Sequence, residues 1–395
     1  GVGAAQGVPG VLMRIASLTP TAVTFPFERE PLSFCFVRVE TDDGVVGYGE
    51  CCDSYGCTFA GAVGAAVSDA FAPLLVGEQL DAVEPHADRL RAWTRRRLGD
   101  RWVGGQARSG VEIALWDTVG RASGHSVSVL LGQVRDRVPV YASSVFLEEG
   151  TAAWHHELLA PLLDRGVRIV KVRIGPEWRR DLATLAELRD RLGRDIELVV
   201  DGSEIFTLAT ALAVAARLGE LGVGWFEEPL PQGARTAIAA LARQSPVAIA
   251  YGEHLYGVDD ALDAVRADEV AVLQPDAATC GGIVEARRMA AVAVAAGRRV
   301  VPHVAAGPVA LAANLHVAAS VPAIRAIEYP FPLAAAWSAL GRGAPLGPDA
   351  IEDGCLPVPD GPGLGVTLDE EAAARHPYSS ISPRAGFPDR FMGDR

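Results

Sequence analysis

From residue 138 to residue 330 the sequence repeats one pattern, a short β-rich apolar run followed by a segment rich in alanine and leucine. The runs lie at residues 138–144, 169–174, 196–202, 223–229, 247–253, 270–276, 299–306 and 324–330. Helical segments separate them, for example at residues 180–192, 208–221, 234–243, 259–266 and 283–296. Strands that alternate with helices in this way form parallel sheets, and eight such units predict a parallel (β/α) barrel. No clear helix is expected after the eighth run.

The chain before the barrel follows another pattern, with strands of period two and then helices. Strand-like and helical stretches are expected at residues 11–25, 32–50, 58–98 and 105–124. The second stretch turns at Asp43-Gly44, and Gly124 ends the last helix. We therefore expect an α+β domain at residues 1–132 and the barrel at residues 133–349. The turn-rich segment 350–395 is expected to return and complete the first domain.

Composition and charge limit the partners of the chain. The net charge of -13 argues against nucleic acid. No apolar run is long enough for a membrane span, and the first residues lack the pattern of a signal peptide. The six cysteines match no zinc-binding spacing, so reduced thiols in a cytoplasmic protein are expected.

Polar residues recur at the end of each predicted strand, where a barrel carries its active site. The residues are Lys171, Arg173, Asp201, Glu227, Glu253, Asp276, His303 and Glu328, and from Asp201 onward they recur every 23 to 27 residues. Three converging carboxylates, Asp201, Glu227 and Glu253, repel one another unless a cation lies between them. Oxygen-only ligands suit a hard ion, so the pattern predicts Mg²⁺ first and Mn²⁺ second.

Two further features favour catalysis at the same end of the barrel. Asp276 and His303 end neighbouring strands, so the carboxylate can orient the imidazole as a general base. Lys171 is the only lysine in a chain that otherwise uses arginine, which indicates a need for a compact ammonium.

These residues stand in motifs that resemble the enolase superfamily and, within it, the mandelate racemase group. The motifs are GVEIALWDTVGRASGHSVSVLLG before the barrel, then KVRIG, VVDGS, WFEEP, YGEH, QPDAATCGGI and PHVAAG on strands two to seven. The resemblance covers most of the chain and implies an N-terminal α+β capping domain over a modified TIM barrel, (β/α)₇β. It implies that Asp201, Glu227 and Glu253 bind magnesium, and that Glu228 is the neighbour of a ligand.

The resemblance also implies roles for the other residues at the strand ends. Asp276 and His303 match the catalytic dyad, and Lys171 and Glu328 match groups that bind the substrate carboxylate, with Ser143 a candidate for the same task. Arg173 replaces a lysine that serves many members as a second base. Arginine keeps its proton at neutral pH, so two-base racemisation is disfavoured.

We therefore predict a Mg²⁺-dependent acid-sugar dehydratase that removes the proton α to a carboxylate and then eliminates water. One alternative is a racemase or epimerase of a hydroxy acid, with Arg173 or Lys171 acting from the other face. A second alternative is a non-catalytic barrel that binds carboxylates.

The partner of this site is expected to be a small carboxylate, either an acid sugar or a hydroxy acid. Two closing loops, near residues 20–30 and 48–60, are expected to set specificity. Their candidate substrate contacts are Phe25, Phe27, Tyr48, Cys52 and Tyr55, although the aromatic residues could equally pack at the domain interface. Barrels of this kind often assemble, so a homo-oligomer is expected.

Overall fold

The computed structural model describes residues 13–27, 31–51 and 59–380. The N-terminal part begins with an antiparallel sheet in the order β1-β2-β3. Its strands are β1 (Ile15–Phe25), β2 (Leu32–Thr41) and β3 (Val46–Cys51). Gly44 has φ 86°, which a tight turn between β2 and β3 requires, so the predicted turn at Asp43-Gly44 is confirmed.

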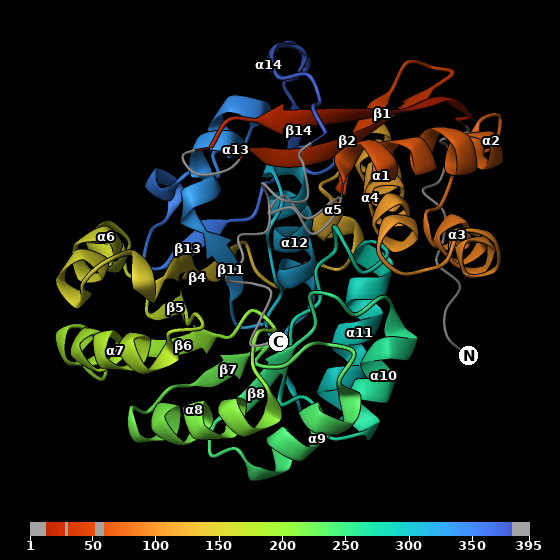
Figure 1. Cartoon of the computed structure of the whole chain (residues 1–395). Helices are drawn as coiled ribbons and strands as arrows, with labels where there is room; N and C mark the ends of the chain where they lie inside the picture. The colour runs from red at the N-terminus through yellow and green to blue at the C-terminus, as the bar shows by residue number, and fades with distance from the viewer. Residues whose placement is uncertain (1–12, 28–30, 52–58, 381–395) are drawn as a thin grey trace.

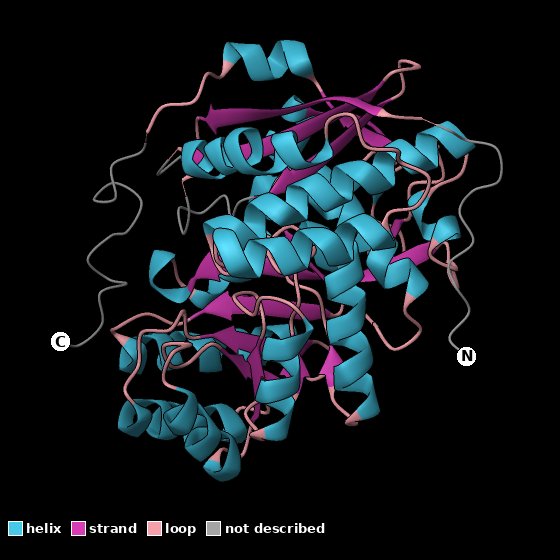
Figure 2. Cartoon of the chain, turned by 90° about the vertical axis from the view of Figure 1, so that its right-hand side faces the viewer, coloured by secondary structure: helices cyan, strands magenta, loops and turns pink. Residues whose placement is uncertain are grey.

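Helices fill the space between this sheet and the barrel (Figure 1, Figure 2). They are α1 (Ala60–Ala66), a π-helical turn (Val67–Phe71), α2 (Ala72–Leu75), α3 (Glu84–Arg97), α4 (Val103–Ser123) and α5 (Val127–Leu130). Gly124 caps α4 in the left-handed conformation, as predicted. A Cβ on Gly49 would lie 1.9 Å from the Gly110 carbonyl oxygen, so only glycine lets β3 approach α4 this closely.

The repeating part of the sequence forms a curled parallel sheet of eight strands, in agreement with the prediction. The strands are β4 (Arg137–Phe146), β5 (Ile169–Arg173), β6 (Glu197–Asp201), β7 (Trp225–Glu227), β8 (Ala248–Tyr251), β9 (Val272–Leu273), β10 (Arg299–Val300) and β11 (Ile327–Pro330). They pair in sequence order from β4 to β10, and β11 pairs with β4. The Glu328 amide donates to the Pro302 carbonyl (3.0 Å), which links β11 to the segment after β10 and closes the barrel.

The connecting helices cover the outside of the barrel (Figure 1). They are α6 (Ala152–Asp164), α7 (Trp178–Leu192), α8 (Leu208–Glu220), α9 (Arg235–Gln244), α10 (Val258–Arg266), α11 (Ile283–Ala295) and α12 (Pro308–Ser320). In α7, Leu182, Leu185, Leu188 and Leu192 are buried at helical spacing, so one apolar stripe attaches the helix to the strands. By contrast, every residue of α12 is buried.

A helix does follow the eighth strand, where none was expected. A 3₁₀ turn (Phe331–Leu333) leads into α13 (Ala334–Leu340). Prolines at positions 330 and 332 hid its start, and the helix is too short to show a clear period. Trp337 holds it in place, because its indole N–H donates to the Ala306 carbonyl (2.9 Å).

The C-terminal segment contacts both parts of the molecule. Strand β13 (Cys355–Pro357) pairs with β4, and β14 (Val366–Leu368) pairs with β12 (Gly341–Gly343). Helix α14 (Glu370–Arg375) follows, and Ser379 beyond it exchanges hydrogen bonds with Thr24 of β1. Two further 3₁₀ turns, Leu147–Glu149 after β4 and Pro348–Ala350 before β13, complete the elements. Among the helices of the described ranges, none has the length and apolar character that a membrane span requires.

Buried carboxylates join the N-terminal part to the barrel. Glu50 on β3 accepts hydrogen bonds from the amides of Gly307 (2.6 Å), Val309 (3.1 Å) and Ala310 (3.0 Å) at the start of α12. Glu112 on α4 accepts from the amides of Ile283 and Val284 at the start of α11. Each carboxylate therefore satisfies free amides of a barrel helix and fixes that helix against the N-terminal layer.

Candidate active site

The polar residues predicted at the strand ends gather at one end of the barrel. Parallel pairing places Arg173 beside Asp201, and Asp201 beside Glu227. Glu253, Asp276 and His303 follow β8, β9 and β10. Because all strands run in the same direction, their carboxyl ends meet at one mouth.

Lys171 on β5 lies among the acids of this mouth. Its ammonium contacts the Glu227 carboxylate and lies 2.7 Å from Glu328 Oε1 and 3.4 Å from Asp201 Oδ2. Its side chain is fully buried. Burial lowers the pKa of Lys171, but the charges of Glu227, Glu328 and Asp201 raise it further than burial lowers it. The lone lysine is thus a protonated cation surrounded by three carboxylates.

Glu227 is held from both sides. Its Oε1 contacts Lys171, and its Oε2 accepts from the Gln274 amide (2.7 Å) and the Trp225 indole (3.1 Å). Burial is the main reason that the pKa of Glu227 is raised to about 7, and Asp201 adds to this effect while Lys171 opposes it. Asp201, Glu328 and Glu253 thus add to the effect of burial on Glu227, and the Lys171 ammonium offsets only part of it.

The donor set at this mouth fits a hard divalent cation. Asp201 and Glu227 lie side by side on paired strands, and Glu253 follows the next strand. All three offer only carboxylate oxygens, which Mg²⁺ prefers. A divalent ion there would compensate the neighbouring carboxylates, whose charges add to burial in raising the pKa of Glu227.

His303 and Asp276 lie together, as their strand positions suggested. His303 Nδ1 lies 3.0 Å from Asp276 Oδ2, so in the neutral ring Nδ1 donates its proton to the carboxylate and Nε2 carries none. Nε2 lies 3.4 Å from Glu253 and 3.9 Å from Glu328. Burial lowers the pKa of His303, whereas the charges of Glu253, Glu328 and Asp276 raise it to about 10. A cation bound by Glu253 would weaken that field and lower the pKa.

Glu328 joins the two groups. It accepts a hydrogen bond from the Ser143 hydroxyl (2.5 Å) and contacts the Lys171 ammonium. Burial raises the pKa of Glu328, but Lys171, His303 and Ser143 outweigh burial and lower the pKa to about 2. Arg173 reaches the other side of the acids, with its Nη2 3.4 Å from Asp201 Oδ2 and its Nη1 3.4 Å from the Ser203 hydroxyl.

The predicted substrate contacts in the loops remain predictions. Cys52 and Tyr55 lie outside the described residues. The Tyr48 hydroxyl donates to Glu370 of α14 (2.8 Å), and the ring of Phe25 lies 4.9 Å from that of His376. These contacts join the first sheet to the C-terminal segment. Phe27 packs against the main apolar core.

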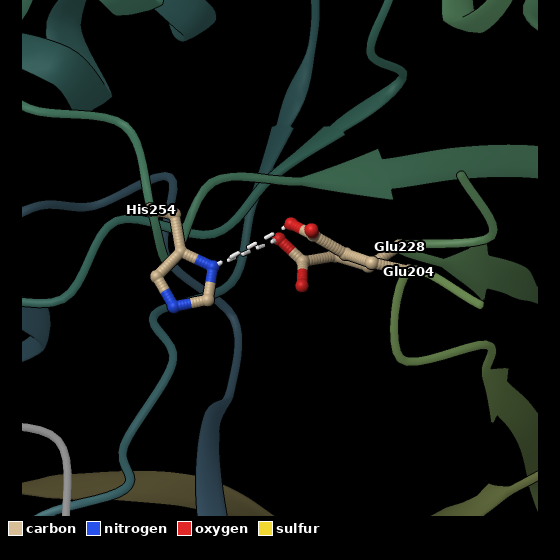
Figure 3. Close-up of side chains that lie close together, drawn as sticks. All are labelled: Glu204, Glu228 and His254. Atoms are coloured by element: carbon tan, nitrogen blue, oxygen red, sulfur yellow. Dashed lines mark ion pairs between the residues drawn. The ribbon is translucent and has the colours of Figure 1, made fainter. Parts of the chain in front are cut away.

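Two groups of polar residues extend the site beyond the predicted ligands and catalytic residues, although Glu228 in the second group was expected as the neighbour of a ligand. Asn314 on α12 donates to Asp276 Oδ1 (2.8 Å), and no feature of the sequence marks this position within an apolar helix. The second group is Glu204, Glu228 and His254, whose ligand atoms lie within 4.8 Å of one another (Figure 3). Glu228 and His254 stand beside predicted metal ligands in WFEEP and YGEH, and that adjacency was the available signal.

Comparison with known proteins agrees with this arrangement. Residues 14–132 match the model of the mandelate racemase / muconate lactonizing enzyme N-terminal domain. Residues 155–372 match the enolase C-terminal domain-like model. The chain belongs to the mandelate racemase/muconate lactonizing enzyme family of the enolase superfamily. The resemblance inferred from the motifs is therefore confirmed, and so is the modified TIM barrel.

Relatives in this family include enzymes of two kinds. D-galactarolactone cycloisomerase of Agrobacterium fabrum is 31% identical, over 88% of this chain and 93% of the relative. Arabinonate dehydratase of Saccharolobus solfataricus is 31% identical, over 86% of this chain and 89% of the relative. The solved structure of 3,6-anhydro-D-galactonate cycloisomerase from Zobellia galactanivorans matches with a TM-score of 0.82 and 25% identity, over 93% of this chain and 100% of the other. The chain is thus an enzyme of the enolase superfamily, in which Mg²⁺ is the typical metal.

Proposed function

We propose that this enzyme is a Mg²⁺-dependent acid-sugar dehydratase, which converts a sugar acid into a 2-keto-3-deoxy acid. The observation that carries the proposal is the His303–Asp276 pair, whose Nε2 faces the mouth beside Glu253. The relatives named as dehydratases act on sugar acids, which supports the substrate class.

Asp201, Glu227 and Glu253 would hold the metal. When bound, Mg²⁺ supplies positive charge that stabilises the enediolate formed from the substrate carboxylate. Lys171 supplies a second positive charge from within the same cluster of acids.

The chain's own residues would then carry the protons. His303 Nε2 accepts the proton from the carbon α to the carboxylate, and Asp276 stabilises the resulting imidazolium. The electron pair of the C–H bond passes into the enediolate, which expels the β-hydroxyl. His303 returns its proton to that hydroxyl, so water leaves and the enol product becomes the keto acid.

The residues on the opposite side of the barrel favour elimination over two-base racemisation. Arg173 keeps its proton at neutral pH, and it lies against Asp201. The Lys171 ammonium has three carboxylates around it. Neither is therefore suited to remove a second proton from the opposite face.

Isomerisation is the second candidate, because several relatives are cycloisomerases. Such a reaction can begin with the same proton abstraction. Product mass separates the two, since dehydration lowers the mass by one water whereas isomerisation leaves it unchanged. Incubation in D₂O would reveal racemisation or epimerisation, because only these place deuterium at an inverted α-carbon of the recovered acid.

The test is a screen of mono- and diacid sugars with Mg²⁺, followed by mass spectrometry. We expect a keto acid from at least one substrate, loss of activity on chelation, and its return with Mg²⁺ or Mn²⁺. His303→Asn should abolish turnover, whereas the matched change His125→Asn, at an exposed histidine, should not. Full activity in His303→Asn would overturn the mechanism, and no consumption of any acid would favour a non-catalytic binding protein.

A further inference from the structure

Three side chains outside the predicted magnesium ligands meet at the same end of the barrel. Glu204 follows β6, Glu228 follows β7 and His254 follows β8, and they point toward one another (Figure 3). His254 Nδ1 lies 3.7 Å from Glu204 Oε1 and 3.8 Å from Glu228 Oε1. Both contacts are ion pairs that are longer than a hydrogen bond, so the three groups surround a common point.

Glu228 gives independent evidence that something belongs at this point. Its side chain is 5% exposed, and its Oε1 is buried without a hydrogen bond from any described residue. A buried carboxylate oxygen without a hydrogen bond costs free energy, and the second carboxylate beside it adds repulsion. A cation between the three groups would remove both costs.

The backbone that carries two of the three groups adopts strained conformations, which cost conformational free energy. Ser203, Glu204 and Glu228 have φ values of 48°, 61° and 36°, which side-chain-bearing residues rarely adopt. The Glu204 amide donates to the Glu228 carbonyl (2.6 Å), which fixes the two loops together. The His254 ring in turn packs beside the ring of Trp102, with 5.0 Å between the two ring centroids.

The group is separate from the predicted magnesium ligands, although it adjoins them in sequence. The oxygens of Glu227 contact Lys171, Gln274 and Trp225, whereas Glu228 faces His254 and Glu204. The two sets of contacts have no residue in common.

We propose that Glu204, Glu228 and His254 form a second metal site, which takes Zn²⁺ in preference to Mg²⁺. An imidazole nitrogen with two carboxylate oxygens is a donor set suited to zinc, whereas Mg²⁺ prefers oxygen alone. Ligand atoms of a tetrahedral zinc site lie ~3.4 Å apart, close to the observed separations. The Glu204 side chain is 32% exposed, so the fourth position opens toward solvent and is available to water or to a donor group of a substrate.

The experiment uses a background in which the predicted magnesium site is disabled. The tag-free Asp201→Asn protein is stripped of metal and dialysed against micromolar Zn²⁺ with excess Mg²⁺, and bound zinc is counted by mass spectrometry. We expect one zinc per chain. Adding Glu204→Gln or His254→Gln should weaken binding about tenfold or more, whereas His125→Gln, at an exposed histidine, should not. Co²⁺ serves as the spectroscopic probe, since a four-coordinate ion absorbs strongly in visible light.

Several results would overturn the proposal. One is the absence of stoichiometric zinc in the Asp201→Asn background, and another is equal binding after Glu204→Gln and His254→Gln. Glu204 is partly exposed, so Glu204→Gln tests the site even if His254→Gln fails to fold. Because zinc is counted without turnover, the result is independent of whether the dehydratase assay succeeds.

Discussion

His316 on α12 offers a test of how burial controls a titrating group far from the metal ligands. The ring is fully buried. The Ser128 amide donates to its Nδ1 (3.0 Å), so Nδ1 carries no proton. Nε2 must then carry the proton, which it donates to the Leu364 carbonyl (3.1 Å). The neutral ring therefore satisfies both contacts, and protonation at Nδ1 would place an N–H against the Ser128 N–H.

The change in the free energy of unfolding with pH follows from the pKa of His316. Burial lowers the pKa of His316 from 6.5 to about 4, although the bond to Leu364 opposes this effect. The unfolded chain thus binds a proton more readily than the folded chain between these two values. The stabilisation is complete above pH 6.5 and is lost as the pH falls toward 4. From pH 8 to pH 5 the loss is about 2 kcal/mol.

The assay is urea unfolding of the unmodified chain and of His316→Asn at both pH values, followed by tryptophan fluorescence and circular dichroism. Coincident transitions are needed before a free energy is read from them. Asparagine can still accept from Ser128 but does not titrate, so the variant should lose about 2 kcal/mol less than the unmodified chain on acidification. His125→Asn should retain the original pH dependence. The same pH dependence in His316→Asn as in the unmodified chain would refute the reasoning.

Three further outcomes are expected. Asn314→Ala should lower kcat about tenfold with little change in KM, because Asp276 loses one hydrogen-bond donor. The acidic limb of the pH profile of kcat should also shift, and an unchanged profile would argue against a positioning role for Asn314. Lys171→Arg should reduce kcat/KM about 100-fold or more, since the larger guanidinium does not fit a fully buried position; activity near that of the unmodified chain would contradict this. Glu50→Ala should lower the free energy of unfolding by about 3 kcal/mol, because alanine leaves three amides at the start of α12 without an acceptor. Glu50→Gln should lower it by less, and equal losses in urea unfolding would count against the cap.

The barrel was predictable because its signal is repeated. Each of the eight runs became a strand in sequence order, and parallel pairing then fixed which strand ends meet. Glu227 and Asp276 could be assigned to the mouth from phase alone, since each ends a run of buried residues. The helix Ala334–Leu340 escaped prediction because it occurs once, follows two prolines and is too short to show a period.

Contacts that depend on loop conformation could not be predicted in the same way. Asn314 reaches Asp276 from α12, a helix whose first turn is fixed by Glu50, a residue 264 positions earlier in the chain. Glu204 meets Glu228 because both residues adopt positive φ values, which no sequence rule assigns to glutamate. Polar contacts between separate loops are set by tertiary structure, whereas strand-end positions are set by local pattern.

The lone lysine illustrates how composition and structure explain each other. In a chain that uses arginine for nearly every positive charge, Lys171 occupies a fully buried position among three carboxylates. A guanidinium there would carry five donors in one plane, and this rigid geometry would hold it against two of the carboxylates. An ammonium is smaller and can rotate, so under the proposed function it would be able to turn toward a substrate carboxylate if a divalent ion took the oxygens of Glu227 and Asp201. The Arg173 side chain is 18% exposed, so the larger guanidinium contacts Asp201 from a less enclosed position than that of Lys171.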